Sequence, residues 1–309
     1  MIPLTPIRGS PETQAALAAA LAAEFPDRAG GPHRILSDGW DCLAGEAEGW
    51  IVRVPRTKAA CERLRGEPAA AALFARHAPL SVPVLTLRES PVLYTVHRRV
   101  PGRPVDPANY EAFDDASRDR LADILARTFA AAHAVPAKEV AAAGIGRTPP
   151  WPGADALWQA VRPRLEAPLA ALAADVIGDV AAQAPDRAVF GHFDTHGWNM
   201  AYDDAAQRLV GLFDFGNAGL GPRHTDLSYP SFVAPDLTHR VVVRYRDITG
   251  VRVDLDRVFA IHIVLRLVEV AKERDDVATR VWALTDWVAA LERHRARLAA
   301  LGQGTRPMA

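Results

Sequence analysis

The sequence predicts a two-part α+β protein, in which a small antiparallel sheet precedes a larger and mainly helical part. Between residues 34 and 98, short strand-like runs alternate with turn residues, which is typical of strands joined by tight connections. From Ala116 onward apolar residues recur at helical spacing, with one polar, glycine-bearing interruption at 188–221. A chain of 309 residues can hold two such parts, because single cores stop growing near about 250–300 residues.

The first part starts with a predicted helix at 11–24, because Ser10 is a favourable cap and a proline follows it. A second helix is expected at 57–77, and we expect Gly66 and Pro68 to bend it. The strands expected around these helices are 34–37, 41–44, 50–54, 82–87 and 92–98. This order predicts a small antiparallel sheet with one helix inserted after its third strand.

The turn-rich segment 100–104 has no periodicity, so we divide the chain there into parts 1–99 and 100–309. The helices expected in the second part are 116–133, 154–165, 168–184, 237–249, 255–272 and 277–300. The polar island at 188–221 interrupts them, and its strand-like runs are 199–202 and 209–213. Polar loops on a regular scaffold are where function tends to lie.

The charge balance of the chain excludes several classes of partner. The formal net charge is −1 and the isoelectric point is about 6.8, which gives no basic surface for nucleic acid or an anionic membrane. The first residues lack the basic start and continuous apolar run of a signal peptide, and no apolar stretch is long enough to span a bilayer. We therefore expect a cytoplasmic protein that binds neither nucleic acid nor membrane.

Cysteine content and histidine placement bear on metal binding. Cys42 and Cys61 are the only cysteines, too few for a disulfide framework or a structural zinc site. His192 and His196, beside Asp194, allow the alternative of a metal site built on nitrogen ligands. Zinc requires three or four converging ligands, so the sequence disfavours this alternative.

The polar island contains the residues that carry chemistry. Residues 191–199 read GHFDTHGWN, and Asp214-Phe215-Gly216 follows one hairpin later. Phosphoryl transfer needs an Asp that orients the accepting hydroxyl and oxygen ligands that hold Mg²⁺ against the phosphates. Asp194, with Asn199 five positions on and Asp214 after the next strand, supplies these parts in the order that protein kinases use.

The run His192-x-Asp194-x-x-x-x-Asn199, followed by Asp214-Phe215-Gly216, resembles the aminoglycoside phosphotransferase and choline kinase-like (APH) family. The stretch 216–222 is similar to the family's segment after its metal-binding Asp. Further similarities lie at the short glycine loop 37–41, the third strand 50–56 and the turn Val100-Pro101-Gly102. The resemblance spans about residues 30–230 in order, and it implies a two-lobed, protein-kinase-like fold with residues 1–99 as the nucleotide-binding lobe.

The resemblance also implies roles for individual residues. Asp194 would orient or deprotonate the acceptor hydroxyl, and Asn199 and Asp214 would hold Mg²⁺. His192 would support the loop rather than act as a base, and Asp226 would tie the loop down.

On the nucleotide side, the resemblance assigns three further residues. Arg53 would contact the phosphates of ATP or GTP, with Glu67 as the acid that orients it. Gly39 would let the backbone approach the same phosphates.

Three departures from the family pattern accompany these assignments. Phe193 stands where the family usually has glycine, and Arg53 stands where lysine is commoner. Arginine keeps the charge of lysine but is a planar fork rather than a point charge. Arg223 and His224 occupy a stretch that is acidic in many members.

The predicted function is transfer of the nucleotide γ-phosphate to a hydroxyl of a small molecule, either an aminoglycoside-like antibiotic or a hydroxylated metabolite. A non-catalytic, kinase-like nucleotide-binding module is the alternative that Phe193 and Arg53 favour, whereas the full set of Asp194, Asn199 and Asp214 favours catalysis. A protein kinase is disfavoured, because the chain from Asp214 to Asp226 has no room for an activation segment. Direct in-line transfer is expected, without a phosphoenzyme.

Overall fold

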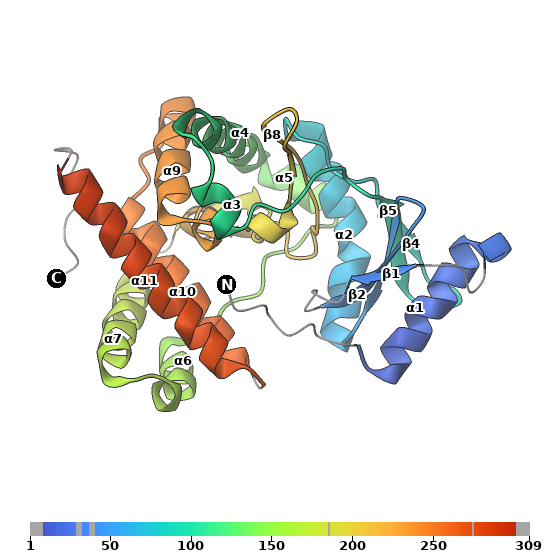
Figure 1. Ribbon diagram of the computed structural model, residues 1–309, viewed down its shortest axis with the longest axis horizontal. Coiled ribbons are helices and arrows are strands. Elements are labelled where there is room, and N and C mark those ends of the chain that lie inside the picture. Colours follow the sequence, from blue (N-terminus) through green and yellow to red (C-terminus); the bar gives the residue numbers. More distant parts are fainter. Residues whose placement is uncertain (1–8, 29–32, 37–40, 185, 274, 301–309) are drawn as a thin grey trace.

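The computed structural model describes residues 9–28, 33–36, 41–184, 186–273 and 275–300, and it has a sheet at one end and a larger helical lobe at the other (Figure 1). The sheet is antiparallel, with strand order β1-β2-β3-β5-β4. Its strands are β1 (Arg34–Leu36), β2 (Cys42–Ala47), β3 (Trp50–Pro55), β4 (Thr86–Arg88) and β5 (Tyr94–Arg98). The mixed α+β class and the two-lobed arrangement predicted from the sequence are confirmed.

Helix α1 (Pro11–Glu24) covers one face of the sheet, and the Ser10 side chain caps it by accepting from the Thr13 N–H. Leu17 and Leu21 of this helix pack with Val52 and Val54 of β3. Side chains alternate across a strand, so Arg53, between these two valines, points to the opposite face. Helix α2 (Lys58–His77) lies on that opposite side, where its Glu67 side chain pairs with Arg53.

Helix α2 joins the two lobes. It continues through Gly66 and Pro68 without a break. Its second half, which includes Leu73 and Phe74, belongs to the main core of the helical lobe. Burial of this half in a packed core outweighs the single backbone hydrogen bond that proline removes.

The helical lobe has two cores. Helices α4 (Asp115–His133) and α9 (Pro235–Thr249) pack against each other in the first. The second joins α6 (Ala154–Val161), α7 (Ala167–Ala182), α10 (Leu255–Lys272) and α11 (Val277–Ala300), at the end of the molecule remote from the sheet (Figure 1). The short helices α3 (Pro107–Glu111), α5 (Ala137–Ala142) and α8 (Arg223–Asp226) connect the longer elements.

Two small ladders form the polar island. Strands β7 (Met200–Asp203) and β8 (Arg208–Leu212) make the expected hairpin. Strands β6 (Ala188–Gly191) and β9 (Gly219–Pro222) pair with each other, a ladder that the sequence analysis did not anticipate. Together the two ladders hold the segments 192–199 and 213–218 side by side.

The observed elements differ from the expected ones mainly at their ends. Of the strand expected at 82–87, only its end forms a strand, as part of β4, and the backbone of Ser81 just before it bonds to Val210 and Leu212 of β8. Gly39 lies outside the described residues.

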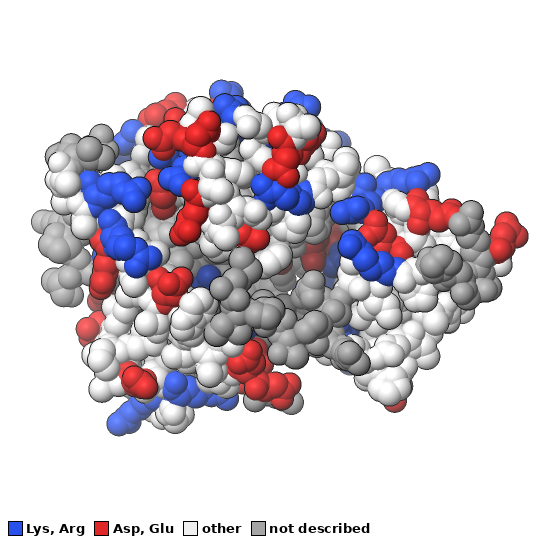
Figure 2. Space-filling view, viewed as in Figure 1, with Lys and Arg blue, Asp and Glu red and all other residues white. Residues whose placement is uncertain are grey.

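None of the described helices is long and apolar enough to span a membrane. On the face shown in Figure 2, acidic and basic side chains are interspersed.

Candidate active site

The segment 192–199 leaves β6 through a residue with a left-handed backbone. Phe193 has φ +54° and is 3% exposed, a conformation that costs a non-glycine residue about 1–2 kcal/mol. Its main-chain N–H donates to the Asp226 carboxylate at 2.6 Å. Its ring occupies the space over Gly221, where an added Cβ would come within 2.6 Å of the ring. The phenylalanine therefore takes the backbone shape that glycine would take, and its buried ring offsets the strain.

The buried Asp226 carboxylate holds the segment 192–199 in place. It is fully buried, and its second oxygen contacts His133 Nε2 at 3.0 Å, while His133 Nδ1 lies 3.0 Å from the Tyr245 hydroxyl. His192, also fully buried, contacts the Phe213 carbonyl oxygen at 3.2 Å. Both residues thus hold main-chain segments of the site in place.

The Asp194 carboxylate lies between the side chains of Asn217 and His196. The Asn217 amide donates to one carboxylate oxygen at 3.2 Å, and His196 Nε2 lies 3.3 Å from the other. Burial raises the pKa of Asp194 above its ordinary value; His196 opposes this shift and the Asp214 charge adds to it. The carboxylate is therefore held by two neighbours yet remains about one-fifth exposed.

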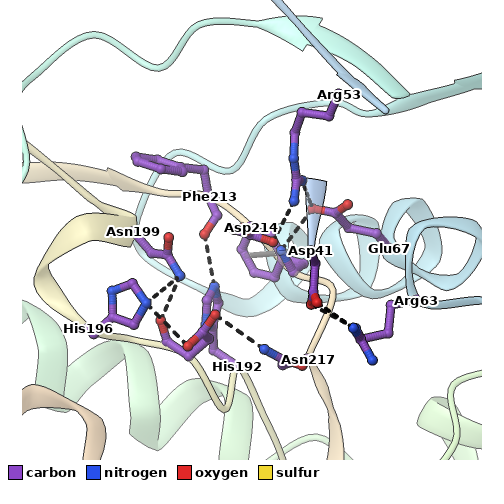
Figure 3. Close-up of polar contacts among 12 residues, drawn as sticks. Asp41, Arg53, Arg63, Glu67, His192, His196, Asn199, Phe213, Asp214 and Asn217 are labelled. Carbon is purple, nitrogen blue, oxygen red and sulfur yellow. Dashed lines mark hydrogen bonds and ion pairs between the residues drawn. The ribbon is translucent and has the colours of Figure 1, made fainter. Parts of the chain in front are cut away.

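Asn199 and Asp214 offer oxygen atoms beside it. The Asn199 amide nitrogen donates to the Asp194 carbonyl at 2.9 Å, so the amide oxygen points away from that carbonyl (Figure 3). The Phe213 N–H donates to the Asn199 carbonyl at 3.1 Å, which brings Asp214 next to this loop. Asp214 has φ +65° and its side chain is 40% exposed. Amide and carboxylate oxygens are the ligands that Mg²⁺ takes together with substrate phosphates, so these residues fit that ion.

Arg53 links the sheet lobe to this site. Its guanidinium donates to Glu67 at 2.5 Å and to Asp214 at 2.7 Å. Glu67 is 1% exposed and also accepts from the Phe215 N–H at 3.0 Å. Burial raises the pKa of Asp214, but the Arg53 charge outweighs it and holds that pKa below its ordinary value. The Asp214 carboxylate is thus kept ionised, as a cation ligand must be.

A family profile described as the phosphotransferase enzyme family (APH) matches residues 34–258 of the chain. The chain belongs to this family. The resemblance noted in the sequence is thereby confirmed, and with it the reaction class of phosphotransfer.

Solved structures resemble this phosphotransferase over nearly their whole length. The GDP complex of wild-type aminoglycoside 2′-phosphotransferase-IIIa superposes with a TM-score of 0.75 at 20% identity, covering 89% of this chain and 98% of that one. Macrolide 2′-phosphotransferase type I gives 0.63 at 18% identity, with 91% and 99% covered. A macrolide 2′-phosphotransferase from Brachybacterium faecium gives 0.60 at 22%, with 88% and 98% covered. No curated protein sequence matches the chain.

Five of the six predicted site residues of the phosphotransferase lie together, and Gly39 lies outside the described residues. The five are Arg53, Glu67, Asp194, Asn199 and Asp214. Sequence reasoning missed Asn217, although it stands in the quoted run after Asp214 and its amide is a common carboxylate partner.

The sequence also gave no sign of an ion pair between Asp41 and Arg63 beside this site. The two side chains are joined by hydrogen bonds of 2.5 and 2.9 Å, and the Arg63 Cβ would lie 3.8 Å from a Cβ added at Gly216. The Asp41–Arg63 ion pair thus ties the residue before β2 to α2.

Proposed function

We propose that the chain transfers the terminal phosphate of ATP or GTP to a hydroxyl of a small molecule, directly and in line, with Mg²⁺. The observation that carries the proposal is the convergence of Asp194, Asn199 and Asp214 with the guanidinium of Arg53. Nucleotide and acceptor complexes among the solved neighbours support it: one holds GDP and kanamycin, and another holds streptomycin and ATP.

Asp194 would accept the proton of the attacking hydroxyl. Asn217 and His196 hold its carboxylate between them, which fixes the direction in which the hydroxyl must approach. Positioning of this kind, rather than covalent chemistry, supplies most of the rate in phosphoryl transfer. The acceptor oxygen would therefore attack the γ-phosphate without a phosphoenzyme.

Asn199 and Asp214 would hold Mg²⁺, which neutralises charge on the phosphates when bound. Arg53 would contact the phosphates from the sheet side, oriented by Glu67, and Gly39 would allow close approach of the backbone. We propose the division of labour that this implies, with residues 1–99 binding the nucleotide and residues 100–309 supplying the metal ligands, the base and the acceptor pocket.

A non-catalytic nucleotide-binding module is a second candidate. The observation that favours it is the Arg53–Asp214 ion pair of 2.7 Å, since a guanidinium on this carboxylate competes with a cation. The two candidates differ in turnover: a module binds nucleotide without transferring phosphate to any acceptor.

The test is phosphate transfer against aminoglycosides, macrolides, choline-like amines and sugars. Asp194→Ala is expected to lower transfer by about 10²–10⁴-fold, because the base is lost, with the fold and nucleotide binding retained. Asp175→Ala, at an exposed position of α7, is the control and should transfer at the wild-type rate. Full activity of Asp194→Ala would refute the assigned role, and nucleotide binding by the wild type with no transfer would favour the module.

A further inference from the structure

The acceptor must approach Asp194 from the side opposite the nucleotide, because attacking and leaving oxygens lie in line. Arg53 and Glu67 mark the nucleotide side, and they lie on the far side of Asp214 from His196 (Figure 3). On the other side His196 touches Asp194, and its ring lies 5.9 Å from that of Phe232. Phe232 and the residues packed around its ring therefore lie on the side from which an acceptor would approach.

These residues form what we call the α10 wall: Tyr229, Phe232, His262, Arg266 and Glu269. Three of them lie at positions i, i+4 and i+7 of α10 and so share one face of that helix. The partly exposed Phe232 ring is the centre of the wall. The Arg266 guanidinium carbon stands 4.2 Å from its centroid, the His262 ring meets it edge-on at 4.6 Å, and Tyr229 stacks beside it at 5.9 Å.

The formal charges of the wall cancel. The Arg266 guanidinium donates to the Glu269 carboxylate at 3.3 Å, and further along the same helix Glu273 pairs with Arg280 at 3.2 Å. Burial, with the nearby Arg266 charge, lowers the pKa of His262 well below its ordinary value, so this ring is neutral. Burial raises the pKa of Tyr229, and the Asp194 and Glu269 charges add to this, so the phenol stays neutral.

This arrangement differs from what a polycation needs. The acidic run at 269–276 could have formed an anionic wall, but its first two carboxylates are each paired with an arginine. The face of Phe232 on which an ammonium could rest is already covered by Arg266. An acceptor would therefore meet aromatic surface and a guanidinium rather than free carboxylates.

We propose that this phosphotransferase selects an acceptor with a broad apolar face and at most one positive charge over a polycationic amino sugar, and that Arg266 sets this preference. The inference rests on the proposed function, because it concerns the acceptor of that reaction. Tyr229 and Phe232 contact the apolar face. Arg266 pairs with the Glu269 carboxylate and covers a face of the Phe232 ring, so the additional ammonium groups of a polycation find no free carboxylate at this wall.

The experiment measures equilibrium binding by calorimetry at low ionic strength, where charge effects are least screened. Kanamycin serves as the polycation, and erythromycin, a macrolide with one amine, as the apolar acceptor. The wild type is expected to bind erythromycin at least about ten-fold more tightly than kanamycin. Equal or tighter binding of kanamycin, or no binding of erythromycin, would overturn the proposal.

Two substitutions on α10 isolate the charge. Arg266→Gln is expected to tighten kanamycin binding by about ten-fold, because it frees the Glu269 carboxylate to pair with an ammonium group. Lys272→Gln removes the same charge from an exposed position on another face of the helix, and it should leave kanamycin binding unchanged. Equal effects of the two substitutions would show that net charge, and not the wall, decides.

Arg266→Lys tests whether altered packing, rather than loss of charge, causes the effect. It keeps the charge, so it should keep the wild-type preference. If Arg266→Lys bound kanamycin as tightly as Arg266→Gln, the charge-based proposal would fail. Failure of the proposed function is a separate result, since it would appear as acceptor binding without phosphate transfer.

Discussion

Phe193 shows how a residue other than glycine can hold a left-handed backbone in the segment 192–199. Its backbone is left-handed at φ +54°, and its ring fills the space beside Gly191 and Gly221. The side chain therefore has opposite effects on stability: its Cβ strains the backbone and its ring contributes buried apolar contact.

Substitutions at position 193 separate these effects. Phe193→Ala is expected to destabilise the protein by about 3–5 kcal/mol, because a buried ring is removed while the strain remains. Phe193→Gly removes the strain as well, so it should be more stable than the alanine variant by about 1 kcal/mol. Urea unfolding measures both values, and an alanine variant more stable than the glycine variant would contradict this explanation.

Arg53 shows what a guanidinium does at a position where the family resemblance leads us to expect lysine. A planar guanidinium can donate to two carboxylates at once, and here it bridges Glu67 and Asp214. A lysine ammonium in its place would be a point charge without this fixed geometry. The substitution thus adds a direct tie between β3, α2 and the segment after β8.

At the scale of elements, the short 3₁₀ turn Gly197–Asn199 positions a proposed metal ligand. The Val105 N–H donates to the Gly197 carbonyl at 3.0 Å, and a Cβ added at Gly197 would overlap the Val105 carbonyl oxygen. The turn is docked so closely against the segment before α3 that only glycine fits.

Gly197→Ala is therefore expected to destabilise the protein by about 1–3 kcal/mol. It should also lower phosphate transfer by about 10²-fold, because Asn199 is displaced with the turn. Gly178→Ala is the control: a Cβ there meets no described atom within 4 Å, and alanine in a helix interior should stabilise α7 by about 0.5–1 kcal/mol. Wild-type activity of Gly197→Ala would show that the turn tolerates movement.

At the scale of the whole molecule, buried histidines make the free energy of unfolding depend on pH. Burial lowers the pKa of His97 to about 4, and burial together with His239 lowers that of His294 to about 4. The unfolded chain binds these protons near pH 6.5 whereas the folded chain does not, so stability is lost as pH falls from about 6.5 toward 4.

The free energy of unfolding is expected to fall by about 1–2 kcal/mol per histidine between pH 7 and pH 5. Urea unfolding at the two pH values measures the loss. His294→Gln should reduce it, because one of the protons is then no longer taken up on unfolding. A free energy that is unchanged across this range would mean that these side chains are protonated in the folded protein.

Much of the fold follows from local patterns. The helices at α1, α10 and α11 begin and end at the residues that periodicity predicted, since caps and apolar spacing are properties of neighbouring residues. The continuity of α2 through Pro68 did not follow from them. It depends on burial of Phe74 against Phe190 and Phe215, which are distant in the chain.

The sequence by itself determined the family, the two-part α+β class and the order of the residues expected to act, because motif spacing and periodicity are local. Only the tertiary structure decided that Arg53 reaches Asp214, 161 positions away, and that Arg266 covers the Phe232 ring. Such contacts form only where packing of distant segments brings the side chains together. The same holds for Glu269 and Glu273, whose carboxylates pair with Arg266 and Arg280 in the folded chain.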